Sequence, residues 1–253
     1  MDLLQGFADI SLWQLSLVAA VALFASVVGG VTGYGSSALM PLVLVPLIGP
    51  EPVVPIVSIS GLFNNVTRAF AFREYVDLKR GTIIMLAAVP PCMLGAYTYT
   101  KLTSAGILIA IGTMLCLSVP LRRWLVHMKV QMNNSGLAAG SAAYGFLAGS
   151  TTGSGVILLS LLMASGLTGA WVVATDALVS IAVAVSKLLV FGVSGAMTPQ
   201  VIALGLLIGL VALPGAFLAK ALVERLPVHV HTGILDGIVL VGGAMMVFGA
   251  FRQ

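Results

Sequence analysis

Charged residues are scarce in this sequence. Only 8% of its 253 residues are Asp, Glu, Lys or Arg, whereas 59% are hydrophobic. Soluble domains carry about 25% charged residues because their surfaces face water. The composition therefore excludes an ordinary soluble domain. It predicts an all-α, polytopic membrane protein, because a chain that crosses lipid must satisfy its backbone polar groups within helices or a closed barrel.

Cysteine and histidine are also few, with two and three residues. Cys92 and Cys116 lie in apolar stretches, which does not indicate a disulfide framework. His229 and His231 lie in a predicted loop without a Cys or carboxylate cluster, so we expect neither a metal nor a cofactor. The Gly-Ser-Gly sequence around Ser154 resembles that of an intramembrane serine protease. No predicted span contains a histidine to act as its base, so we do not expect an enzyme.

The N-terminus contains Asp2 and Asp9 but no basic region, so we expect no signal peptide. The formal net charge is +4, and the basic residues fall mainly in short loops. That distribution is typical of loops beside a lipid bilayer, and we expect no nucleic acid partner.

Ten apolar runs follow one another, at about 11–30, 36–48, 53–72, 81–99, 104–121, 136–149, 155–166, 170–193, 199–217 and 232–250. A helix needs roughly 20 residues to cross the hydrocarbon. Seven runs approach this length, and the three shorter ones, 36–48, 136–149 and 155–166, are predicted half-helices. Glycine-rich breaks at 29–35 and 149–155 adjoin them, where helix continuation is weakest.

Three loops contain eight of the twelve basic residues, namely Arg73, Lys79 and Arg80, then Arg122, Arg123 and Lys129, then Lys220 and Arg225. Basic loops remain in the cytoplasm. All three can do so only if 11–48 is a hairpin entering from outside and 136–166 a hairpin entering from the cytoplasm. Both termini are then outside. We expect a first transmembrane repeat over 1–121, a basic cytoplasmic linker over 122–135 and a second repeat over 136–253.

The two halves share a repeated sequence. At an offset of 120 the identical positions in the first half are Gly29, Thr32, Gly33, Gly35, Leu39, Leu42, Leu47, Gly49, Val53 and Ser60. The repeat begins on opposite sides of the membrane in the two halves, which is an inverted-topology repeat. Such repeats place a binding site near the midplane, where broken helices meet.

The segments GGVTGYGSSALMPLVLV and YGFLAGSTTGSGVILL, in duplicated halves of this length, resemble the TauE/SafE sulfite exporter family. This family is also called the 4-toluene sulfonate uptake permease family. The resemblance extends from about Ser11 to Phe251. It implies a multi-pass protein of the bacterial cell (inner) membrane that moves sulfite, a sulfonate such as sulfoacetate, or thiosulfate. The particular anion, the direction of transport, the coupling ion and the oligomeric state stay open.

An anion inside a bilayer needs hydrogen-bond donors and positive helix N-termini in place of water. The two breaks supply candidates, which are Thr32, Gly33, Gly35, Ser36 and Ser37 in the first half and Thr151, Thr152, Gly153, Ser154 and Gly155 in the second. We predict that one anion lies between the two tips. The alternative is that these small residues only permit close helix packing.

Three charged residues, Arg68, Asp176 and Lys187, lie within apolar runs, where a charge usually indicates a function. Lys187 is the deepest cation, and we predict that it binds the anion. Arg68 either binds or extends to the cytoplasmic surface. Asp176 is either a proton carrier or the partner of a cation on another helix. Asn64 precedes Arg68 by one turn on the same face. A channel built on paired half-helices is the main alternative, and a hydrolase using Ser154 is the second.

Overall fold

The computed structural model describes residues 7, 10–32, 35–128, 132–223 and 228–251. Side chains are described over the same ranges except at 28–32, 35–36, 122–123, 125–128, 216–223 and 228–235. The described chain is all-helical, as expected, and contains no strand.

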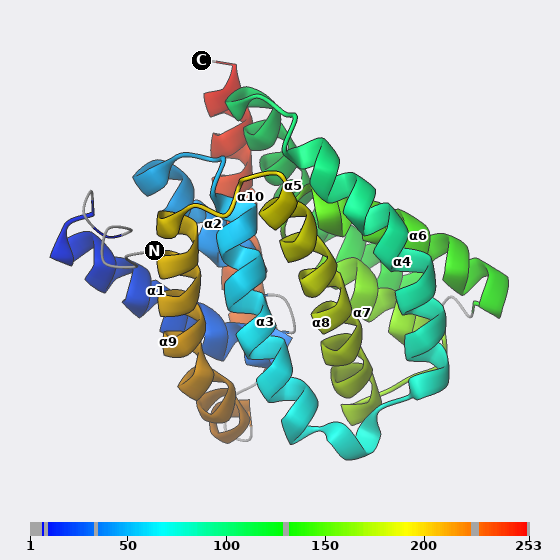
Figure 1. Cartoon of the computed structure of the whole chain (residues 1–253). Coiled ribbons are helices and arrows are strands. Elements are labelled where there is room, and N and C mark those ends of the chain that lie inside the picture. The colour runs from blue at the N-terminus through cyan, green and yellow to red at the C-terminus, as the bar shows by residue number, and fades with distance from the viewer. Residues whose placement is uncertain (1–6, 8–9, 33–34, 129–131, 224–227, 252–253) are drawn as a thin grey trace.

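Ten α-helices and one 3₁₀ helix make up the described structure (Figure 1). In chain order they are α1 (Leu12–Thr32), α2 (Gly35–Ile48), α3 (Val53–Ala71), η2 (Arg73–Tyr75), α4 (Leu78–Tyr99), α5 (Ser104–Met128), α6 (Asn134–Ser150), α7 (Gly155–Ala164), α8 (Ala170–Val193), α9 (Pro199–Val223) and α10 (Val228–Ala250). Seven of them have at least 19 residues, and the three shorter ones are α2, α6 and α7.

Helices α3 and α8 pack side by side in the middle of the molecule (Figure 1). Helix α9 packs on α3, and α1 packs on α9. On the other side α4 packs on α8, and α6 packs on α4. Helices α5 and α10 pack against each other, with α7 against α5 and α2 against α10. This arrangement puts the central pair where a site inside the bundle would be lined from both halves of the chain.

Glycine allows α4 and α6 to approach each other closely. A Cβ atom at Gly149 would lie 2.0 Å from the Cys92 carbonyl oxygen, and one at Gly145 would lie 2.1 Å from that of Ala88. No side chain fits at such distances, so both glycines serve helix packing. For Gly149, which begins the predicted second break, packing is the role that the structure shows.

Local sequence fixes where two of the helices begin. The Asp77 side chain accepts a hydrogen bond from the Arg80 backbone N–H and caps α4, and Asn133 caps α6 through the N–H of Gly136. Both are preferred N-cap residues because a short oxygen reaches the unpaired N–H groups of the first turn.

The helices extend further than the apolar runs in several places. Helix α1 continues to Thr32 and α6 to Ser150, so the predicted breaks at 29–35 and 149–155 are too long. Helix α5 continues to Met128, well past residue 121. Helix α10 begins at Val228, so His229 and His231 lie in a helix and the predicted loop is wrong. Hydropathy ends a run at the first polar residues, whereas helical hydrogen bonding continues through them.

Three described helical segments are long and apolar enough to cross a membrane, namely 78–99, 104–121 and 170–193. Exposed Leu, Phe, Val and Met side chains lie on many of the helices. A helical chain with this surface is a membrane protein, because lipid rather than water must cover these side chains.

Candidate functional site

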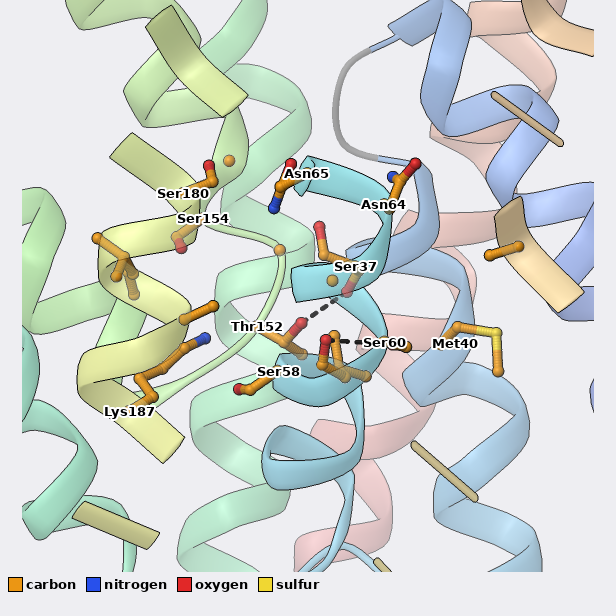
Figure 2. Close-up of a pocket in the computed structure, with 18 of the residues that line it drawn as sticks. Ser37, Met40, Ser58, Ser60, Asn64, Asn65, Thr152, Ser154, Ser180 and Lys187 are labelled. Atoms are coloured by element: carbon orange, nitrogen blue, oxygen red, sulfur yellow. Dashed lines mark hydrogen bonds between the residues drawn. The ribbon is translucent and has the colours of Figure 1, made fainter. Parts of the chain in front are cut away.

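A cavity of about 120 Å³ lies inside the bundle, lined mainly by α3, α8 and the segment between α6 and α7, with further residues from α1, α2, α6, α7 and α9 (Figure 2). Every predicted site residue whose side chain is described lines this cavity. They are Ser37, Asn64, Arg68, Thr151, Thr152, Gly153, Ser154, Gly155, Asp176 and Lys187. The fold therefore brings together residues that the sequence places up to 150 positions apart. Their roles in binding stay predictions.

The second break, residues 151–154, forms one wall of the cavity. The Thr152 hydroxyl donates to the Ser37 carbonyl oxygen at 2.8 Å, which joins this break to the beginning of α2 (Figure 2). The Thr151 hydroxyl donates to the carbonyl of Ala110 on α5 at 3.2 Å. Both hydroxyl protons are thus engaged with backbone carbonyls. A ligand oxygen would have to replace one of these carbonyl acceptors to receive a hydrogen bond from the Thr151 or Thr152 hydroxyl.

Gly153 occupies a backbone conformation that favours glycine, with φ of +86°. A side chain there would be strained, because L-residues rarely adopt positive φ. The residues after it, Ser154 and Gly155, begin α7 and also line the cavity. The N-terminal end of this ten-residue helix therefore lies at the cavity, where the N–H groups of a first helical turn favour negative charge.

Lys187 extends from α8 into the cavity, toward Ser58 and Thr152 (Figure 2). It forms no ion pair with any residue that the structure describes. A cation without a carboxylate partner inside a membrane protein is costly unless an anion or carbonyl compensates it.

Arg68 of α3 and Asp176 of α8 form an ion pair, with Nη2 and Oδ2 3.0 Å apart. Their side chains are only 8% and 3% exposed, so Arg68 does not extend to a surface. Of the two readings of Asp176, the pairing with a cation on another helix is the one observed. Asp176 and Lys187 are eleven positions apart on α8, which is about 16 Å along the axis. Arg68, which pairs with Asp176, and Lys187 therefore lie at different heights.

Two asparagines of α3 complete this part of the lining. The Asn65 Oδ1 atom accepts a hydrogen bond from Arg68 Nη1 at 3.3 Å. The Asn64 Oδ1 atom is buried and has no hydrogen-bond partner among the described residues. Since an amide can be turned to present its N–H donors instead, Asn64 offers an unused polar group to whatever occupies the cavity.

Four predicted residues of the first break, Thr32, Gly33, Gly35 and Ser36, lie outside the residues whose side chains are described. Of the first tip, Ser37 is the predicted residue whose side chain is described, and it lines the cavity.

Other polar residues of the lining were not predicted, namely Ser58, Ser60, Tyr144 and Ser180. A signal for two of them was present, because Ser60 and Ser180 are identical positions of the repeat. Ser58 and Tyr144 carried no such signal, since their equivalents at the same offset are Leu178 and Phe24.

Comparison with known proteins gives one match. The sequence model of the family described as Sulfite exporter TauE/SafE matches residues 18–247, nearly the whole chain. No curated protein and no solved structure matches the chain.

Proposed function

Because this chain belongs to the TauE/SafE sulfite exporter family, we propose that it is a secondary transporter whose anion binds in the cavity beside α3, α7 and α8. Membership of the family implies transport of a sulfur-containing anion across a membrane. Our proposal adds a multi-pass placement in the cell (inner) membrane and a substrate class of sulfite, small sulfonates or thiosulfate. It also adds the residues that hold the anion.

The observation that carries the proposed site is the environment of Lys187. Its ammonium group lies in a cavity whose lining also includes the α7 N-terminus and several hydroxyl groups. Ammonium and N–H donors are charge-assisted partners for oxyanions, and they gain strength where water is excluded. A sulfonate-type group presents three oxygens that such donors can share. A neutral or cationic solute would leave Lys187 uncompensated.

The packing of the helices supports a two-fold relation between the halves. If α1 to α5 are equated in order with α6 to α10, the pair α1 with α9 becomes α6 with α4, and both pairs are in contact. The pair α3 with α9 likewise becomes α8 with α4, and α2 with α10 becomes α7 with α5. We propose that the halves are inverted repeats, as the basic loops predict.

Two hydrogen bonds support the hairpin part of this proposal. The Met132 N–H donates to the Ala164 carbonyl oxygen, so the chain entering α6 lies beside the end of α7. The bond from Thr152 to Ser37 joins the tip of that hairpin to α2. An anion between the tips would be held by both halves, so that movement of one half against the other exposes it alternately to each side.

Flux into proteoliposomes tests the function. Labelled sulfite or thiosulfate should enter with saturation, and an internal load of the same anion should accelerate entry by counterflow. An ohmic current without counterflow would identify a channel instead and would overturn the transporter proposal.

Substitution of Lys187 tests the site. Lys187→Met keeps an unbranched apolar stem but removes the charge, and it should lower anion affinity at least about tenfold, roughly 1.4 kcal/mol. Lys101→Met is the matched control, because Lys101 is exposed and lies over the Tyr97 ring. Equal affinities in the two folded variants would exclude Lys187 from the site.

A further inference from the structure

The charges that line the cavity do not balance. Arg68 and Lys187 are cations, and Asp176 is the one carboxylate among the described lining residues. With Asp176 paired to Arg68, the lining carries a net charge of one positive unit. This suits a singly charged anion. A doubly charged anion would leave one negative charge uncompensated in a medium of low polarity, which is costly.

Resting on the function proposed above, we propose that Arg68 is a second anion-binding group. In the ligand-free protein its guanidinium is paired with the Asp176 carboxylate. Protonation of Asp176 frees the Arg68 guanidinium to bind an anion, so binding of a doubly charged anion takes up one proton. The proton comes from water and binds one Asp176 carboxylate oxygen. The ion pair between Asp176 and Arg68 is exchanged for one between Arg68 and the anion. No covalent bond of the anion changes, and the lining with its ligand becomes neutral.

The geometry allows Arg68 to change partner without moving far. One of its nitrogens contacts Asp176 on α8, while another donates to Asn65 on its own helix. The second bond holds the guanidinium at the cavity wall after the carboxylate is neutralised. The charge balance applies to the whole lining, so the anion need not touch Lys187 and Arg68 at the same moment.

The surroundings of Asp176 leave it free to serve as the proton site. Arg68 on α3 and Tyr144 on α6 are the charged or titratable side chains that act on it. Helix α7 contains no titratable residue. The other titratable groups on the helices packed against α8 have other partners or are exposed. Cys92 bonds to Ser186 and Val183, Arg80 pairs with Asp77, Tyr75 stacks on Trp171, and Tyr99 donates to the carbonyls of Pro50 and Glu51. The exposed ones are Arg73, Glu74, Lys79 and Tyr97.

A hydrogen bond from the beginning of α4 also holds the backbone beside Asp176 in position. The Asp77 backbone N–H donates to the Thr175 hydroxyl at 3.0 Å, which fixes α8 to the beginning of α4 one residue before Asp176. Neutralising the carboxylate would therefore leave its position on α8 unchanged while freeing Arg68.

Calorimetry on the purified full-length chain tests the proposal. Binding is measured near neutral pH in buffers that differ in ionisation enthalpy, which gives the number of protons taken up. Thiosulfate, a dianion, should take up about one proton per anion, and methanesulfonate, a monoanion, none. Above the pH where Asp176 ionises, thiosulfate affinity should fall about tenfold for each pH unit, and methanesulfonate affinity should stay constant.

Two acid-to-amide variants separate the cavity carboxylate from others. Asp176→Asn resembles the protonated acid, so it should bind thiosulfate without proton uptake and with the same affinity across this pH range. Asp77→Asn is the matched control, because Asp77 lies outside the lining and Asn also caps helices. It should keep the proton uptake of the unmodified protein.

Thiosulfate binding without proton uptake would overturn the inference and leave the transporter proposal standing, as would unchanged uptake in Asp176→Asn. Binding of neither anion would instead refute the proposed site and the inference with it. If Asp176→Asn does not fold, the comparison of the two anions on the unmodified protein decides alone.

Discussion

Removing the charge of Arg68 should destabilise the protein strongly, because Asp176 would keep a negative charge in the interior with no partner. The Asp176 side chain is only 3% exposed, and among the residues that the structure describes it forms an ion pair with Arg68 alone. Breaking a buried pair by removing one partner costs about 3–5 kcal/mol. Arg68→Met should lose stability in this range. Arg68→Met combined with Asp176→Leu should recover to within about 1 kcal/mol of the unmodified protein, since apolar replacement of a buried pair is often neutral.

The assay is reversible unfolding in mixed micelles, with the four proteins of the double-mutant cycle compared. Arg73→Met supplies the control, because Arg73 is an exposed arginine whose contact with the Phe70 ring is worth about 0.5–1 kcal/mol. The loss in Arg68→Met should also shrink at acidic pH, where the carboxylate can bind a proton instead. A loss no larger than that of Arg73→Met, or additive effects in the double mutant, would refute the reasoning.

Three further predictions concern the break, the ends of the chain and the cap of α4. Gly153→Val should abolish anion binding because valine resists the positive φ, and Thr152→Val should weaken it by removing the bond to Ser37; unchanged titrations would contradict both. A C-terminal phosphatase fusion should be active and a C-terminal fluorescent fusion dark, and the reverse would refute the inverted repeat. The Arg80 N–H and guanidinium lower the pKa of Asp77, so its stabilisation should be present above the unfolded-state pKa and lost as pH falls through the lower folded-state pKa. Asp77→Asn should lose stability above that window but not below it, and equal losses across the pH range would contradict this.

Much of the fold could be predicted because lipid imposes simple rules on sequence. Segment lengths gave seven long helices and three short ones in the right order, since a span has a minimum length. Helix ends were less predictable. Polar residues such as Arg122 and Asn134 end a hydropathy run, yet they continue or begin a helix because their backbone groups still pair.

The lining of the cavity was predictable where the repeat or a charge marked it. Thr152, Gly153 and Lys187 were expected in one place, and all three line the cavity. The partnership of Arg68 with Asp176 was not predictable from spacing. These residues are 108 positions apart, and only the packing of α3 on α8 determines which cation a given carboxylate meets.

The charges of the cavity are not repeated between the two halves of the sequence, whereas the hydroxyl residues Thr32 and Thr152, and Ser60 and Ser180, are. Asp176 has Ile56 as its equivalent at the offset of 120, and Ile56 is fully buried in the apolar core. The equivalent of Lys187 in the first half is Thr67, whose hydroxyl donates to the Phe63 carbonyl oxygen of its own helix.

The sequence repeat preserves a threonine and two glycines at each predicted break, namely Thr32, Gly33 and Gly35 in the first half and Thr152, Gly153 and Gly155 in the second. It does not preserve the charges. If the halves are related by a two-fold axis, as proposed, two equal charges facing each other across it would repel in a medium of low polarity. One carboxylate and two cations arranged asymmetrically on α3 and α8 avoid that repulsion. The two cations also differ in their surroundings, because the Arg68 guanidinium pairs with Asp176 and the Lys187 ammonium forms no ion pair with a residue that the structure describes. In the proposal above, Lys187 has no carboxylate partner to lose, whereas the Arg68 guanidinium becomes available to an anion when Asp176 binds a proton.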